Sequence, residues 1–184
     1  MTDAPTPAIA LRPLRQVHQT REFAADAPIA QEALDAIADV ARWSGSSQNT
    51  QPWRFITIRD PDTLRAMAEV GGSNARALAS AAAAIGIVMA VVEGKAVSHA
   101  FDEGRTAERI LVAASMLDLA AGLLWLPSAA RPQLSERLGI PDGWSMRTVI
   151  ALGHPIEGIE RHRARPGTAR LPRTETVFAE RWPG

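Results

Sequence analysis

Cysteine is absent from the 184 residues of the sequence. Its absence excludes disulfides, thiolate nucleophiles, zinc–cysteine sites and iron–sulfur clusters, and it is compatible with a reducing cytosol. The N-terminal stretch MTDAPTPAIALRPLR lacks the basic start and the apolar run of a signal peptide. We therefore expect a cytoplasmic protein.

An excess of charge of either sign is also absent. The sequence has 20 Lys and Arg residues against 20 Asp and Glu residues, and its pI is about 6.9. This balance provides no general attraction to nucleic acid or to an anionic membrane, so we expect neither partner. The long apolar run at residues 110–127 is interrupted by Asp118, and it is shorter than the ~20 apolar residues that cross a bilayer. We expect a buried helix there.

Histidine is scarce, and the four histidines do not lie at metal-ligand spacing from one another. We therefore expect no metal site. His99 lies in a predicted loop near Asp102 and Glu103, where a solvated loop is favoured over an acid/base cluster. The sequence has no Ser–His–Asp pattern with supporting context and no glycine-rich phosphate loop.

The residues that are present are typical of a globular domain. Apolar residues make up 46% of the chain and charged residues 22%, and this length is enough to bury a core. We find no internal repeat and no low-complexity linker, so we predict a single domain over residues 1–184. Residues 1–10 are expected to form a loose tail, and the arginine-rich residues 160–184 an extended C-terminal arm.

Hydrophobic periodicity predicts the order of the secondary-structure elements. After a short helix that ends near Thr20, helices are predicted over residues 27–43, 60–72, 74–84, 102–123 and 131–139, and strands over residues 53–60, 85–93 and 146–155. Asp60 is the N-cap candidate of the second of these helices, and Gly139 closes the last one. This order indicates mixed α and β structure in one layered domain.

One stretch, RWSGSSQNTQPWRF at residues 42–55, carries more hydrogen-bonding side chains than a linker needs. Asn49 and Gln51 each offer a donor and an acceptor, a pairing that suits the edge of a heterocycle such as a pyrimidinedione. The small Ser and Gly residues allow a backbone to approach a flat ligand closely. From the residues alone, a ligand site and a plain polar loop are equally favoured.

This stretch resembles the signature of the nitroreductase family of FMN-dependent NAD(P)H oxidoreductases, in which a helix ends in a loop of small residues, Asn and Gln-Pro-Trp. VHQTREF at residues 17–23 is similar to the family's phosphate-contacting arginine motif. Residues 102–123 resemble its long dimer-forming helix, residues 137–155 its later helix and final core strand, and residues 169–182 its C-terminal arm. The motifs occur in the family's order over most of the chain.

The resemblance implies an α+β fold with three α/β/α layers, a mixed and mostly antiparallel central sheet, a long buried helix and a C-terminal arm exchanged in a homodimer. It also implies that FMN binds at the dimer interface. The chain has His18 and Gln19 where the family commonly has Arg and Ser, and the bulky Trp125 where the family often has a small residue. Carried over position by position, the cofactor-binding residues are His18, Gln19, Arg21, Ser46, Ser47, Asn49, Gln51, Leu124, Trp125 and Arg170.

Two arginines carry the implied phosphate contacts, Arg21 from the first motif and Arg170 from the arm. Guanidinium groups suit a phosphate because they donate two parallel hydrogen bonds. The arginines of residues 161–173 also fit a solvated basic tail or a nucleic-acid contact. The neutral chain and the shortage of nearby aromatic residues favour an arm that delivers Arg170 to the cofactor.

The loop residues Ser46, Ser47 and Asn49 are implied to meet the flavin ring, with Gln51 near it. The backbone of residues 123–125 is implied to lie against the central ring. The implied reaction is a ping-pong hydride transfer from NADH or NADPH, through the flavin, to a nitroaromatic, quinone or similar small acceptor. The cofactor carries this chemistry, so we predict no catalytic side chain.

Two other functions stay open at the level of the sequence. One is a different flavin reaction on the same scaffold, such as reductive dehalogenation or flavin fragmentation. The other is a flavin-binding module without turnover.

Overall fold

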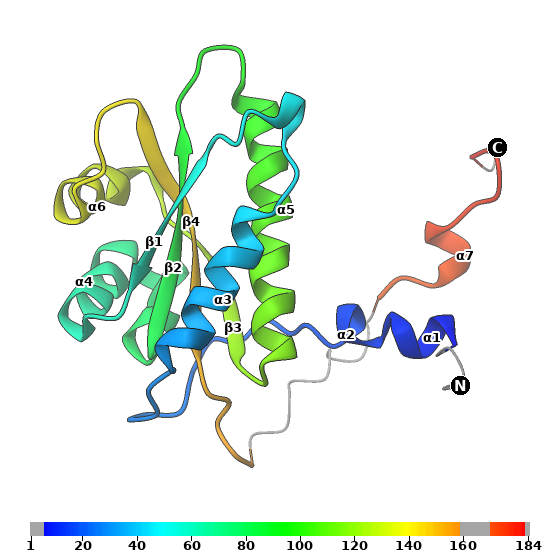
Figure 1. The fold of residues 1–184 in the computed structure, drawn as a ribbon, viewed down its shortest axis with the longest axis horizontal. Helices are drawn as coiled ribbons and strands as arrows, with labels where there is room; N and C mark the ends of the chain where they lie inside the picture. The colour runs from blue at the N-terminus through cyan, green and yellow to red at the C-terminus, as the bar shows by residue number, and fades with distance from the viewer. Residues whose placement is uncertain (1–5, 159–169, 183–184) are drawn as a thin grey trace.

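A four-stranded sheet forms the centre of the protein. The structure is a computed structural model that describes residues 6–158 and 170–182 (Figure 1). The strands lie in the order β1-β2-β4-β3, and each neighbouring pair is antiparallel. Their bounds are Trp53–Ile58 for β1, Ala83–Ala90 for β2, Ala120–Trp125 for β3 and Trp144–Gly153 for β4.

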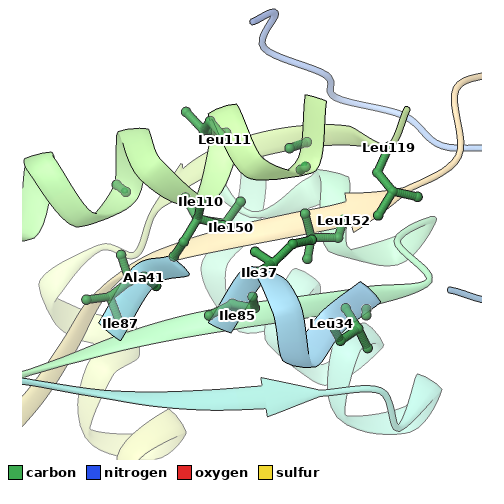
Figure 2. Close-up of a cluster of buried hydrophobic side chains, with 14 of the residues drawn as sticks. Leu34, Ile37, Ala41, Ile85, Ile87, Ile110, Leu111, Leu119, Ile150 and Leu152 are labelled. Atoms are coloured by element: carbon green, nitrogen blue, oxygen red, sulfur yellow. The ribbon is translucent and has the colours of Figure 1, made fainter. Parts of the chain in front are cut away.

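One face of the sheet is covered by α3 (Gln31–Arg42) and α5 (Ala96–Met116). Figure 2 shows the core between them, where Ile37 of α3 and Ile110 of α5 meet Ile85 of the central strand β2. All three side chains are fully buried. Burial of such apolar side chains is the main force that holds the two helices on the sheet.

The other face is covered by α4 (Pro61–Gly71), α6 (Arg131–Leu138) and the 3₁₀ turn η3 (Arg76–Ala79). A second core fills this side, with Met67 of α4, Leu134 of α6 and Val149 of β4 among its members. The three-layer α+β prediction is therefore confirmed. Two further 3₁₀ turns, η2 (Gly72–Asn74) and η4 (Ser128–Ala130), connect these elements.

Two predicted helix ends are confirmed. The carboxylate of Asp60 accepts hydrogen bonds from the backbone N–H of Thr63 at 2.9 Å and from its hydroxyl at 2.6 Å, which caps the start of α4. Gly139 follows α6 with φ of 65° and ψ of 30°, the left-handed conformation in which glycine commonly ends a helix.

The predicted helix over residues 102–123 is wrong at both ends. The helix begins at Ala96, and it ends at Met116, after which Asp118 takes φ of 56° and turns the chain. The following residues form the edge strand β3 instead. Both faces of β3 are covered by helices, so its sequence is apolar throughout and shows no alternation that separates it from a buried helix.

The helix predicted to end near Thr20 is also wrong. Only the short helices α1 (Pro7–Ala10) and α2 (Arg12–Arg15) form, and the chain then runs extended beside β3. Gln19 makes a parallel bridge to Ala121, the one parallel pairing among the described residues. The four named strands themselves pair only antiparallel, so the predicted antiparallel character of the sheet is confirmed and its parallel component is limited to this isolated bridge. The predicted helix over residues 74–84 reduces to η2 and η3, because β2 begins at Ala83.

The two ends of the described chain lie away from the layered body (Figure 1). The short helix α7 (Arg173–Thr176) lies in the C-terminal part, and the predicted arm also includes residues 159–169 and 183–184, which lie outside the described residues. Residues 1–5 of the predicted tail lie outside them too. Exchange of the arm between protomers stays a prediction. Among the described residues, no helix has the length and apolar character needed to cross a membrane.

Candidate functional site

The loop between α3 and β1 has an unusual backbone. Gln48, Asn49 and Gln51 take φ of 52°, 54° and 49°, in the left-handed region that non-glycine residues rarely adopt. Residues held there cost free energy and are concentrated at ligand-binding and active sites. Gln48 and Asn49 belong to the 3₁₀ turn η1 (Ser47–Asn49). This strain favours a ligand site over a plain connection.

Side chains of α5 hold this loop in place. The buried carboxylate of Asp102, 1% exposed, accepts a hydrogen bond from the backbone N–H of Ser47 at 3.0 Å. Arg105 lies 3.8 Å from the same carboxylate, and Arg109 donates to the carbonyl of Trp43 at 3.1 Å. Residues at spacings of three and four share one helix face. One face of α5 therefore anchors the loop at two points.

The absence of a side chain at Gly45 leaves room for the Arg105 guanidinium. A Cβ on Gly45 would lie 2.5 Å from a terminal nitrogen of Arg105, closer than atoms of this kind approach. Glycine at this position therefore matches the presence of the arginine.

The predicted loop residues divide between shaping the loop and facing outward. The hydroxyl of Ser46 accepts a hydrogen bond from the backbone N–H of Gln51 at 2.9 Å, which closes the turn. Ser47, Asn49 and Gln51 are exposed, and the amide of Gln51 donates to Asn49 at 3.3 Å. The loop thus presents linked donors and acceptors on its outer side.

A second group of predicted residues lies along the free edge of β3. The amide of Gln19 donates to the carbonyl of Leu123 at 2.6 Å and accepts from its N–H at 3.0 Å. Thr20 donates its N–H to the carbonyl of Ala121 at 2.8 Å. A Cβ on Gly122 would lie 2.1 Å from the carbonyl oxygen of Thr20, so this close approach requires glycine.

Trp125 continues the same edge. The N–H of Leu126 donates to Arg147 of β4, and backbone groups of an antiparallel strand alternate between its two sides. The N–H and C=O of Trp125 therefore point outward at the edge, as those of Leu123 do. Leu124 points its backbone groups to β4, and its side chain is buried in the core on the α4 side. Of these two predicted residues, only Trp125 presents polar groups at the edge.

His18, Arg21 and Arg170 are exposed. His18 and Arg21 lie on the extended segment beside β3, one residue before Gln19 and two residues after it. Arg170 lies at the start of the described C-terminal part. The structure thus places His18 and Arg21 with the β3 edge.

We name the first set, Ser46, Ser47, Asn49 and Gln51, the loop group. The second set, His18, Gln19, Arg21 and Trp125, is the edge group. The loop group is anchored at Asp102 of α5, whereas Gln19 bridges Ala121 of β3, the strand that follows the end of α5 at Met116. Asp102 and Met116 are about 21 Å apart along the helix axis at ~1.5 Å per residue. Trp125, at the other end of β3, lies closer to the loop end of α5, because it contacts Arg147, which bonds to Glu103. Figure 1 shows the α3–β1 loop at one end of α5 and α2 beside the other end.

Sequence reasoning missed the anchoring residues. His99 lies in α5 and not in a loop, and its ring contacts the carbonyl of Ala90 at 2.9 Å. Asp102 bonds to Ser47, and Glu103 bonds to Arg147, so the three residues form no acid/base cluster. The spacing of Asp102, Arg105 and Arg109 places them on one face of the predicted helix, but no sequence pattern shows that this face lies against the loop.

Comparison with known proteins identifies the family. A sequence model of the Nitroreductase family matches residues 14–88. A protein of Archaeoglobus fulgidus, provisionally named NADH dehydrogenase/NAD(P)H nitroreductase, is 32% identical over 139 residues, which cover 71% of this chain and 76% of that protein. The chain belongs to the nitroreductase family.

Solved structures share the fold. The FMN-dependent nitroreductase of Clostridium difficile superposes with a TM-score of 0.78 at 20% identity, over 92% of this chain and 98% of that chain. The NADPH:FMN oxidoreductase of Vibrio harveyi, complexed with NAD⁺, has a TM-score of 0.77 at 22% identity, over 93% and 77% of the two chains. The predicted nitroreductase-like fold is confirmed.

Proposed function

We propose that the chain is an FMN-dependent oxidoreductase that takes electrons from NADH or NADPH and reduces nitroaromatic, quinone or similar small acceptors. The observation that carries this proposal is the outward N–H of Trp125 at the β3 edge, together with the exposed Asn49 and Gln51 in their left-handed backbone conformation. The family and the names of its similar members support the same general class, an NAD(P)H-dependent flavin oxidoreductase.

The residues fit a flavin mononucleotide. Asn49 and Gln51 offer the donors and acceptors that the polar edge of the ring requires, and the N–H of Trp125 offers a donor to a ring nitrogen. His18 and Arg21 supply cationic or donor groups to a phosphate. The amide of Gln19 keeps one N–H beyond its bond to Leu123. Hydride acceptance from NAD(P)H and electron delivery to the acceptor are the chemistry that FMN supplies when bound.

The chain's own residues would bind the FMN and orient its ring. The loop group would position the polar edge of the ring, the pairing of β3 with β4 holds the N–H of Trp125 outward at the edge, and the arginines would neutralise the phosphate. We assign no side chain to proton transfer, because the cofactor carries the chemistry.

We further propose that each site is completed by a second copy of the chain. The loop group and the His18–Arg21 part of the edge group lie toward opposite ends of α5, so one chain does not bring them together. Exposed apolar side chains on the two outlying segments, Leu14 and Trp182 among them, support association. In this arrangement Arg170 reaches the phosphate from the arm.

A visible spectrum of the purified protein, taken before and after NADPH is added without oxygen, tests the proposal. We expect a flavin absorption band that bleaches on addition of NADPH and returns when a quinone is supplied. Parallel lines in double-reciprocal plots would match the ping-pong order. A colourless protein that takes up no FMN on titration would contradict the proposal, and FMN binding without reduction would identify a binding module.

A further inference from the structure

Strand β4 contains a one-residue bulge at Arg147. Ile87 of β2 pairs with Thr148, whereas the next residue, Val88, pairs with Met146. Arg147 therefore has no partner in β2. A bulge of this kind redirects a side chain and is frequent beside active sites.

The bulge places Arg147 on the α5 side of the sheet. By strict alternation Arg147 would face the α4 side, where Val149 and Ala151 are buried. It reaches Glu103 of α5 instead, and its terminal nitrogen donates to the Glu103 carboxylate. The Glu103 side chain is 4% exposed and that of Arg147 is 28% exposed.

The same guanidinium supports the indole of Trp125. Its central carbon lies 4.5 Å from the centroid of the Trp125 ring, within the range of a cation–π contact. Trp125 is 52% exposed. The arginine thus covers part of the indole, and the rest of the ring stays open to solvent.

The Glu103–Arg147 ion pair is not explained by its contribution to stability. A buried ion pair seldom stabilises a fold more than well-packed apolar residues would. Among the described residues, one carboxylate oxygen of Glu103 and the Nε of Arg147 are buried without a hydrogen-bond partner, and each such atom has a desolvation cost. The ion pair instead provides a rigid support for the Trp125 ring.

We propose that Arg147, held by Glu103, is a positioning residue that fixes the Trp125 indole as one wall of the acceptor site and limits the width of acceptor that enters. The inference rests on the proposed function, because it takes the outward N–H of Trp125 as a contact to the flavin. The indole belongs to the same residue and is therefore close to that contact. Without its support the ring would sample other rotamers and the site would widen.

The kinetic test uses the double variant Glu103→Gln/Arg147→Met, which removes both charges and leaves no unpaired carboxylate in the interior. Steady-state kinetics compare 1,4-benzoquinone with the wider 1,4-naphthoquinone. We expect the ratio of kcat/KM for the wide acceptor to that for the narrow one to rise about tenfold, mainly through KM. An unchanged ratio in the folded variant would overturn the inference.

Arg42→Met is the matched control. Arg42 also pairs with a carboxylate, Asp39, at 2.6 Å and also lies near a tryptophan ring, with 5.3 Å to the centroid of Trp43. All of these groups are exposed on α3 or at its end. We expect the acceptor ratio of this variant to equal that of the unmodified protein, and an equal rise in both variants would overturn the inference.

A second measurement needs no flavin. Acrylamide quenching of tryptophan fluorescence, taken as the difference between each protein and its Trp125→Phe counterpart, reports on Trp125 alone. We expect the double variant to show a larger quenching constant and a red-shifted Trp125 emission. If the protein takes up no FMN, the proposed function fails while this measurement still stands. If Trp125 quenching does not change, the positioning role fails whether or not FMN binds.

Discussion

The loop group and the edge group are held in place by different means. At the β3 edge, the Gln19 amide bonds to a strand backbone, and the close approach depends on the missing side chain of Gly122. At the loop, the side chain of Asp102 reaches out from α5 and bonds to the Ser47 backbone. The edge group is therefore sensitive to added volume, and the loop group to the loss of one carboxylate.

This difference separates two kinds of substitution. A change at the edge has to displace backbone, and it disturbs the sheet as well as the site. A change at the loop releases a strained turn while the layers stay packed. The predictions below test this contrast, from the largest expected effect to the smallest.

Gly122→Ala should have the largest effect. The new Cβ would lie 2.1 Å from the Thr20 carbonyl, and neither backbone can yield without breaking the pairing to Ala121. We expect a loss of about 1–3 kcal/mol in the free energy of unfolding, measured by urea titration, and weaker FMN binding. Gln19→Ala adds no clash and should cost only about 1 kcal/mol. If both variants lose the same stability, close backbone approach is not the important feature of the edge.

Asp102→Ala should loosen the loop and leave the edge intact. The Ser47 N–H loses its buried acceptor, and Arg105 loses its carboxylate. We expect a smaller loss, about 1–2 kcal/mol in the free energy of unfolding, and faster hydrogen exchange in residues 44–51, with no change in residues 120–125. Asp102→Asn keeps an acceptor oxygen, so this variant should lose less of the free energy of unfolding than Asp102→Ala. Equal acceleration in both segments would show that the two groups are not independent.

Asn49→Leu should weaken FMN binding about tenfold, a change of ~1.4 kcal/mol, with little effect on the far-UV spectrum. Leucine removes the amide and is also disfavoured at the φ of 54° that Asn49 adopts. Asn49→Gly is the control, because glycine accepts this φ and lacks only the amide. Affinity measured by flavin fluorescence should fall in both variants, and full affinity in both would remove Asn49 from the site.

The smallest effect is expected at Asp60, which belongs to neither group. The Thr63 hydroxyl first, and the Thr63 N–H second, lower the pKa of Asp60 below its ordinary value of 3.8. The stabilisation that comes with a lowered folded-state pKa is fully present above the ordinary pKa, and it is lost as the pH falls from there through the folded-state pKa. We expect Asp60→Asn to lower the Tm slightly at pH 7, and we expect this difference to shrink as the pH falls below 3.8. FMN affinity should not change, so this variant separates loss of stability from loss of the site.

Local chemistry was sufficient to predict several features from the sequence. The cap at Asp60, the glycine end of α6 and the amphipathic α3 all depend on residues within a few positions of one another. The loop at residues 42–55 was recognisable by its composition, and the family by the order of its motifs. The three-layer fold followed from that resemblance, because the strand β3 itself was predicted as helix.

The sequence by itself determined the helix caps, the polar loop and the family, because each of these features depends on residues that are close together in the sequence. Only the tertiary structure decided that residues 120–125 form an edge strand, since burial on both faces removes the alternation that identifies a strand. It also decided that Asp102 anchors the loop and that Arg147 turns toward Glu103 and Trp125. Those contacts join residues 22 to 55 positions apart, and they depend on a strand register and a bulge that no local pattern encodes.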